Sequence, residues 1–62
     1  MHWLKLHTID DNAAVFINMD NVIRIKQTDH GSFLDFNDAN LYAEVVETPE
    51  EIMALVLKFF KE

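Results

Sequence analysis

The chain has 62 residues, with eleven acids, five bases and no cysteine. This length fits a single domain, 1–62, and a chain so short buries only about 60% of the surface that its unfolded form exposes, so we expect marginal stability. The lack of cysteine excludes disulfides and thiolate zinc sites, and the formal charge of −6 argues against DNA or RNA as a partner. No apolar run is long enough to span a bilayer and no signal peptide opens the chain, which predicts a cytoplasmic protein without membrane insertion.

Five short segments have the alternation or the β-branched and aromatic content that is typical of strands. Polar turns separate them, and they span residues 2–8, 13–17, 22–28, 32–36 and 41–46. In the first segment Leu4 and Leu6 point to one face, which we assign to the core. In the third, Ile23 and Ile25 share a face, and Arg24 lies on the other.

Two of the turns have clear conformational signals. The run Asp10-Asp11-Asn12 favours a turn, because these side chains bond their own backbone and tolerate left-handed conformations. Asp29-His30-Gly31 predicts a tight hairpin in which the glycine adopts a positive φ.

The period changes after the fifth segment. Thr48-Pro49-Glu50-Glu51 has the pattern of a capping box with proline at the first helical position, and Lys58 and Lys61 suit the last turn. A helix is therefore predicted from this point to about Lys61. The expected fold is α+β, a five-stranded antiparallel meander sheet with one C-terminal helix packed on it.

The helix is apolar around more of its circumference than one sheet face requires. Ile52, Leu55, Val56 and Phe59 form one stripe for the core, at about 100° per residue. Three further side chains widen the apolar arc to roughly 200°, against the stripe of about 100° that suffices for packing; they are Met53, Leu57 and Phe60. A domain this small exposes some large side chains in any case. The alternative, which we favour, is that these three form an interface in a homo-oligomer.

No motif for catalysis or for cofactor binding is present. The single glycine rules out a glycine-rich phosphate loop, and Ser32 lacks the surroundings of a nucleophile elbow. The histidines at positions 2, 7 and 30 do not have the helical spacing of a zinc site. We therefore expect a non-enzymatic protein with no catalytic residue, no metal and no cofactor.

One pair of cations is a candidate ligand site. Arg24 and Lys26 project together from the third segment, and an anionic ligand could be held there with aromatic side chains beside it. The candidate aromatic residues are Trp3, Phe33 and Tyr42. The alternative is that the two cations only keep a sheet face soluble.

Residues 17–25 (INMDNVIRI) resemble the segment L-N-x-D-x-I-x-x-I, and residues 46–52 (VETPEEI) resemble a V-x-E-S-x-E-E-V step into a C-terminal helix. In both stretches the chain is similar to the small FlbD/SwrD-type proteins of flagellated bacteria. The chain is also similar to small bacteriophage and prophage accessory proteins. The family resemblance implies a non-enzymatic cytoplasmic protein and offers no catalytic residues.

Two functions remain open at this point. The chain is predicted to be a homo-oligomeric binding module that acts as a protein-interaction adaptor, using the helix and an exposed sheet edge. The alternative is a sequestering protein of phage type, which traps a small anionic signalling nucleotide in pockets between subunits.

Overall fold

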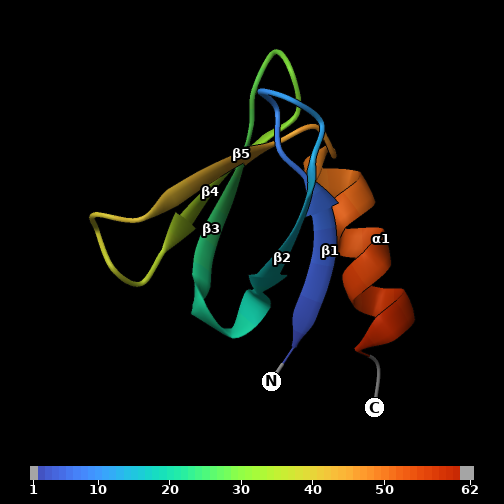
Figure 1. The fold of residues 1–62 in the computed structure, drawn as a ribbon. Coiled ribbons are helices and arrows are strands. Elements are labelled where there is room, and N and C mark those ends of the chain that lie inside the picture. The colour runs from blue at the N-terminus through green and yellow to red at the C-terminus, as the bar shows by residue number, and fades with distance from the viewer. Residues whose placement is uncertain (1, 61–62) are drawn as a thin grey trace.

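A computed structural model describes residues 2–60, with five strands, one short 3₁₀ helix and one α-helix. The elements are β1 (Trp3–His7), β2 (Ala14–Asn18), η1 (Met19–Asn21), β3 (Val22–Gln27), β4 (Ser32–Phe36), β5 (Tyr42–Val45) and α1 (Pro49–Phe59) (Figure 1). The α+β class and the order of strands followed by a helix are thus confirmed. The helix ends at Phe59, short of the predicted Lys61, and Lys61 lies outside the described residues.

The strands form two antiparallel sheets, so the prediction of a single meander sheet is not met. β1 pairs with β2, and β3, β4 and β5 form a separate three-stranded sheet in that order. The physical reason is η1, because it turns the chain between β2 and β3 so that these neighbours in sequence do not pair. The side chain of Asn18 caps this turn by accepting from the amide of Asp20.

The two sheets meet at one corner. Thr8 and Val45 form an isolated antiparallel bridge. Beside it the amide of Ile9 donates to the carbonyl of Glu44 at 3.1 Å, and the amide of Val46 donates to the carbonyl of His7 at 2.9 Å. The end of β1 is therefore attached to the end of β5, and β3 is left as the terminal strand of its sheet.

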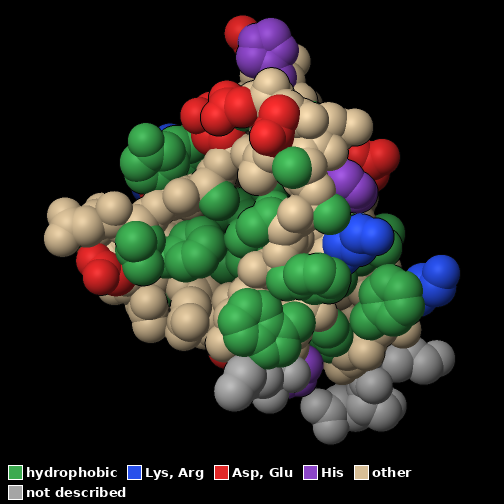
Figure 2. Space-filling model, in the orientation of Figure 1, with side chains coloured by type: hydrophobic (Ala, Val, Ile, Leu, Met, Phe, Trp, Pro, Cys, Tyr) green, Lys and Arg blue, Asp and Glu red, His purple; other side chains and the backbone are tan. Residues whose placement is uncertain are grey.

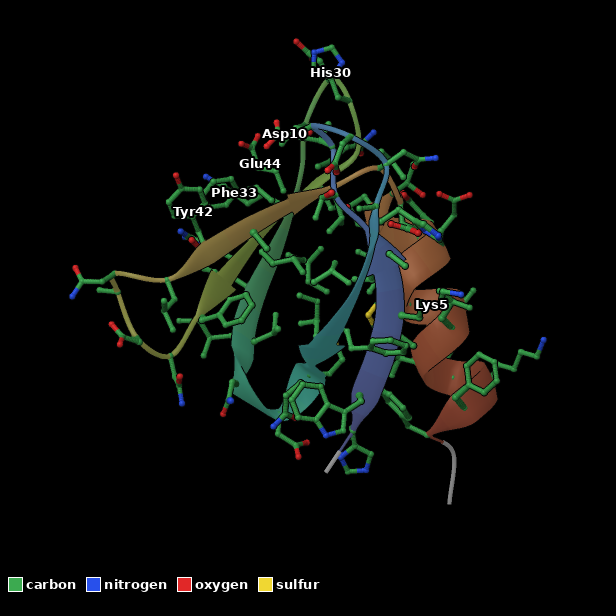
Figure 3. The ribbon with its side chains drawn as sticks, viewed as in Figure 1. Lys5, Asp10, His30, Phe33, Tyr42 and Glu44 are labelled. Carbon is green, nitrogen blue, oxygen red and sulfur yellow. The ribbon has the colours of Figure 1, made fainter. Side chains whose placement is uncertain are left out.

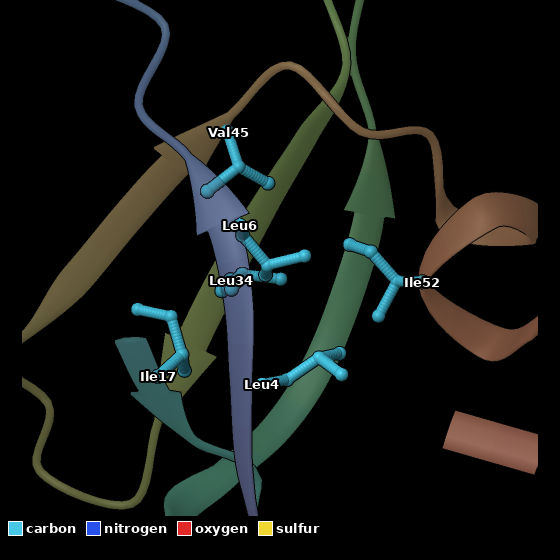
Figure 4. Packing of buried hydrophobic residues seen from close by; sticks show 6 residues of the cluster. All are labelled: Leu4, Leu6, Ile17, Leu34, Val45 and Ile52. Atoms are coloured by element: carbon cyan, nitrogen blue, oxygen red, sulfur yellow. The ribbon is translucent and has the colours of Figure 1, made fainter. Parts of the chain in front are cut away.

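The core lies between the two sheets and α1 (Figure 4). Six buried hydrophobic side chains form it: Leu4, Leu6, Ile17, Leu34, Val45 and Ile52. The predicted inward face of the first strand is confirmed, and each of these side chains contributes about 1.5–3 kcal/mol on burial. The buried hydroxyl of Ser32 donates to the carbonyl of Glu47 at 2.7 Å, so this polar group is satisfied.

The prediction for β3 is wrong at one residue. The register shifts between Val22 and Arg24, so Ile23 is an extra residue in a β-bulge. Val22 and Ile25 consequently both pack against the core, whereas Ile23 is 69% exposed. The bulge breaks the two-residue alternation that placed Ile23 with Ile25.

Helix α1 begins as predicted, but the packing of its last residues differs from the prediction. The hydroxyl of Thr48 accepts from the amide of Glu51, and the Glu51 side chain accepts from the amide of Thr48, which completes the capping box. Phe59 was expected in the core stripe but is 60% exposed. Phe60, which follows the last helical residue, packs against the core instead, with its ring edge-on to His2 at 4.9 Å between centroids.

Candidate binding sites

Four of the five predicted ligand residues lie together on the outer face of the three-stranded sheet. Opposite the inward row of Ile25, Leu34 and Ala43, the register forms two outward rows across the strands. One row is Lys26, Phe33 and Glu44, and the other is Arg24, Asp35 and Tyr42. We call these six residues the aromatic face; Phe33, Tyr42 and Glu44 appear together in Figure 3.

Two stacked aromatic rings lie at the centre of the aromatic face. The rings of Phe33 and Tyr42 are stacked, with 5.4 Å between centroids and 9° between planes. The ammonium of Lys26 lies 5.2 Å from the centroid of Phe33, within the range of a cation–π interaction. Tyr42 is 66% exposed, so one partner of the stack is open to a ligand.

The charges on the aromatic face are already balanced. The Nε atom of Arg24 donates to Oδ2 of Asp35 at 2.7 Å. Glu44 stands opposite Phe33 in the register, next to the ring that Lys26 covers. Two cations are therefore accompanied by two carboxylates, which weakens the attraction of this face for an anion.

Trp3 does not join the other four residues. It belongs to the β1–β2 sheet, opposite Asn18, at the end of β1 away from the corner that contacts β5. Its outward neighbours are Lys5 and Phe16, which are paired across the strands. Figure 2 shows hydrophobic side chains gathered over β1, β2 and α1, and acidic side chains at the loop end of the molecule.

A second candidate site lies between β3 and α1. An apolar groove of about 440 Å³ follows the β3 strand there and is bounded by η1 and by the first turns of α1. Its lining consists of Met19, Val22, Ile23, Arg24, Ile25, Pro49, Met53 and Val56. We call this the β3 groove; within the described residues, it follows the sheet edge that pairs with no further strand.

The sequence contains an irregularity at the bulge of β3, which the assumption of strict alternation overlooks. Val22 and Ile23 are adjacent apolar residues before the alternation of Arg24, Ile25 and Lys26, and this interruption coincides with the bulge. The contribution of α1 had no comparable signal, because helix packing against β3 depends on tertiary contacts.

The predicted oligomer residues differ in exposure. Leu57 is 67% exposed and Met53 is 47% exposed, and Met53 also lines the β3 groove. Phe60 is only partly exposed because it packs on the core. Leu57 and Phe59 are therefore the large apolar side chains that α1 exposes most.

Hydrogen bonds lower the pKa of three carboxyl groups. Burial raises the pKa of Glu47, but hydrogen bonds from the ring and the amide of His7 outweigh it and hold the pKa below its ordinary value. The His2 side chain lowers the pKa of Asp20, and the Thr8 hydroxyl lowers that of Asp11. No group of three or more His, Asp or Glu side chains converges on a metal position within residues 2–60.

Comparisons with protein-family models, with curated proteins and with solved structures returned no match. In the described part of the chain, neither helix combines the length and the apolar character needed to cross a bilayer.

Proposed function

We propose that this protein is a non-catalytic binding module that acts as a protein-interaction adaptor through the β3 groove. The observation that carries the proposal is the coincidence of an apolar groove with the terminal strand of a sheet. The groove has a volume of about 440 Å³, within the range of roughly 300–1,000 Å³ that is typical of pockets for small ligands, so it can hold a few side chains of a partner. An edge strand adds unpaired backbone groups that a partner chain can use.

The balance of charge favours the groove over the aromatic face as the main site. On the aromatic face, Asp35 and Glu44 accompany the two cations. The groove is lined almost entirely by apolar side chains, with Arg24 as its charged member. Burial of apolar side chains in the groove would then favour binding without the cost of breaking an existing ion pair.

Self-association is a second element of the proposal. Large hydrophobic side chains remain exposed on both sheets and on α1, including Trp3, Phe16, Leu57 and Phe59. A standard interface buries about 800 Å² per partner, which is a modest part of the 4510 Å² surface of this chain. We propose a homo-oligomer that buries part of this apolar surface. The proposed cytoplasmic location is what the resemblance to FlbD/SwrD-type proteins implies.

The sequestration of an anionic nucleotide is the alternative function. The stacked rings of Phe33 and Tyr42 favour it, because an exposed aromatic ring can stack on a base. Arg24 uses its Nε atom for Asp35, which leaves the terminal nitrogens for a phosphate. In this alternative the oligomer would have to add further positive charge to the site.

Site-specific photo-crosslinking tests the adaptor proposal. A benzophenone amino acid is placed at position 23, in the β3 groove, and at position 38, in the exposed turn before β5, as the matched control. After irradiation in the producing cells, we expect a discrete protein adduct from position 23 that position 38 does not form. Equal labelling from both positions, or none from position 23, would contradict docking in this groove.

A further inference from the structure

We propose that the occupant of the β3 groove is an extended segment of a partner protein, which adds to the free edge of β3 as an antiparallel strand. Its side chains alternate between aliphatic residues facing the groove and acidic or aromatic residues facing Arg24 and Lys26. The inference rests on the proposed docking function and specifies the chemistry of the partner. Three observations support it: the direction of the backbone groups, the chemistry of β4, and the charge of β3.

The hydrogen-bond parity of β3 identifies which backbone groups face the open edge. At one end the amide of Thr28 donates to the carbonyl of Gly31 at 3.0 Å, and beyond the other end Asn37 donates to Asn21 at 2.8 Å. Since bonded and non-bonded pairs alternate along an antiparallel ladder, Arg24 and Lys26 bond to β4. The N–H and C=O groups of Ile25 and Gln27 point away from β4, toward the free edge.

These edge groups have no other backbone partner within residues 2–60. A strand added there would therefore form a bonded pair opposite Ile25 and another opposite Gln27. The bulge at Ile23 interrupts the regular edge, so the pairing extends over the stretch from Arg24 to Gln27. Addition of an extended peptide to a sheet edge is a common mode of recognition, in which the main chain provides affinity and alternate side chains provide specificity.

The pairing of β3 with β4 shows which side chains fit opposite those of β3. β4 places Asp35 opposite Arg24, where the ion pair is 2.7 Å long. It places Leu34 opposite Ile25 and Phe33 opposite Lys26, whose ammonium covers the ring. A partner on the free edge meets the same alternation of two cations around one aliphatic residue, so the order aromatic, aliphatic, acidic that β4 presents also fits there.

Charge disfavours a second copy of β3 as the occupant. If two β3 strands paired antiparallel about Ile25, each Arg24 would stand opposite the Lys26 of the other copy. Like charges directly opposite each other in a sheet are destabilising. β3 has two cations and no carboxylate, whereas the whole chain has a net charge of −6. On β3 the bond from Nε of Arg24 to Asp35 leaves the terminal nitrogens of the guanidinium for an acidic side chain of a strand on the free edge.

A synthetic peptide with the sequence of residues 31–38 (GSFLDFND) is the probe, labelled with fluorescein and titrated with the full chain. A second peptide has lysine in place of the first aspartate. By fluorescence anisotropy we expect saturable binding of the first peptide and at least tenfold weaker binding of the second. Failure of the first peptide to bind, or equal binding of both, would overturn the inference.

The edge itself is tested by Gln27→Pro beside Gln27→Ala. Proline removes the outward-facing N–H without removing a ladder bond to β4, a position where edge strands accept it. The side chain is exposed, so no core contact is lost. We expect Gln27→Pro to abolish peptide binding while circular dichroism shows a folded chain, and Gln27→Ala to bind like the wild type. Unchanged binding by a folded Gln27→Pro variant would exclude strand addition.

The outcomes also separate this inference from the adaptor proposal. An adduct from position 23 without peptide binding would leave docking in the groove intact and refute the alternating acidic segment. If Gln27→Pro instead reduced the mass of an oligomer in light scattering, a second copy would be the occupant, and the inference would be wrong.

Discussion

The ring Nδ1 of His7 lies 2.7 Å from Oε2 of Glu47, and the amide of His7 donates to Oε1 of the same carboxylate at 3.0 Å. Forty positions separate the two residues. The pair attaches the end of β1 to the segment that leads into α1, next to the corner where the two sheets meet. One carboxylate therefore connects the end of β1 to the segment between β5 and α1.

The lowered pKa of Glu47 predicts a loss of stability in acid. Because the folded pKa lies below the ordinary value of 4.5, this carboxylate stabilises the fold above that pH, and the contribution disappears as the pH falls through the folded pKa. We expect Glu47→Gln to flatten the dependence of the melting temperature on pH below about 4.5. The pKa values of Asp11 and Asp20 are lowered as well, so some dependence of the melting temperature on pH should remain in this variant. An unaltered acid profile in Glu47→Gln would contradict this assignment.

The capping box of α1 predicts a measurable loss in Thr48→Ala. Loss of a side-chain cap costs about 1 kcal/mol, which lowers the melting temperature by roughly 4–8 °C in a domain of this size. Thr48→Ser retains the hydroxyl that accepts from Glu51 and serves as the control. Thermal unfolding by circular dichroism measures both; equal melting temperatures for the two variants would show that the cap is energetically silent.

Gly31 is expected to be the least tolerant position of the β3–β4 hairpin. Its φ of 155° is positive, as predicted, and a Cβ there would lie 2.1 Å from the carbonyl oxygen of Val45. Overpacking against backbone costs about 1–3 kcal/mol and an unfavourable φ about as much again, so Gly31→Ala should lose more than about 2 kcal/mol. His30→Ala changes the exposed neighbour and should be close to neutral. Denaturant unfolding compares the two.

The exposed side of α1 predicts the oligomeric state. We expect light scattering at micromolar concentration to show at least a dimer, and Leu57→Asp to shift the mass downward because it places an unpaired charge in an apolar interface. Glu50→Gln, at an exposed position of the first turn, should leave the mass unchanged. Phe60→Asp tests folding instead, since that ring packs on the core. A wild-type species of 7.3 kDa would exclude self-association.

The nucleotide alternative predicts a specific role for Arg24. A guanidinium can hold a phosphate with two hydrogen bonds, whereas Lys26 offers a point charge. In calorimetry against mono- and cyclic nucleotides, Arg24→Ala should abolish binding without changing the oligomer mass, and Arg24→Lys should restore part of it. If the wild type binds none of these nucleotides, the alternative fails for that panel. Binding that survives Arg24→Ala would place the ligand elsewhere.

Local patterns predicted the elements of this fold well. The alternation around Leu4 and Leu6, the signals at Gly31 and the capping box at Thr48 each depend on residues close in sequence, and the structure confirms all three. Two of the candidate aromatic residues, Phe33 and Tyr42, do lie together and stack on each other.

The features that sequence reasoning missed are set by contacts between distant residues. Whether β2 pairs with β3 depends on the short turn η1, whose 3₁₀ geometry has no strong composition signal. The exposure of Ile23 follows from one bulge, and the exchange of Phe59 for Phe60 follows from where the helix ends, because Phe60 then packs on the core and on the ring of His2. The β3 groove requires β3 and α1 to be placed together, which no local pattern specifies.

The bridge between Thr8 and Val45 also predicts an order of assembly. The hairpins β3–β4 and β4–β5 close over short loops, whereas the corner joins positions 8 and 45 and pays the larger loop-closure entropy. We expect the three-stranded sheet β3–β4–β5 to form before the β1–β2 hairpin docks onto it. In native-state hydrogen exchange, the amides of Ile9 and Val46 at the corner should then open together, at a lower free energy than those of β4.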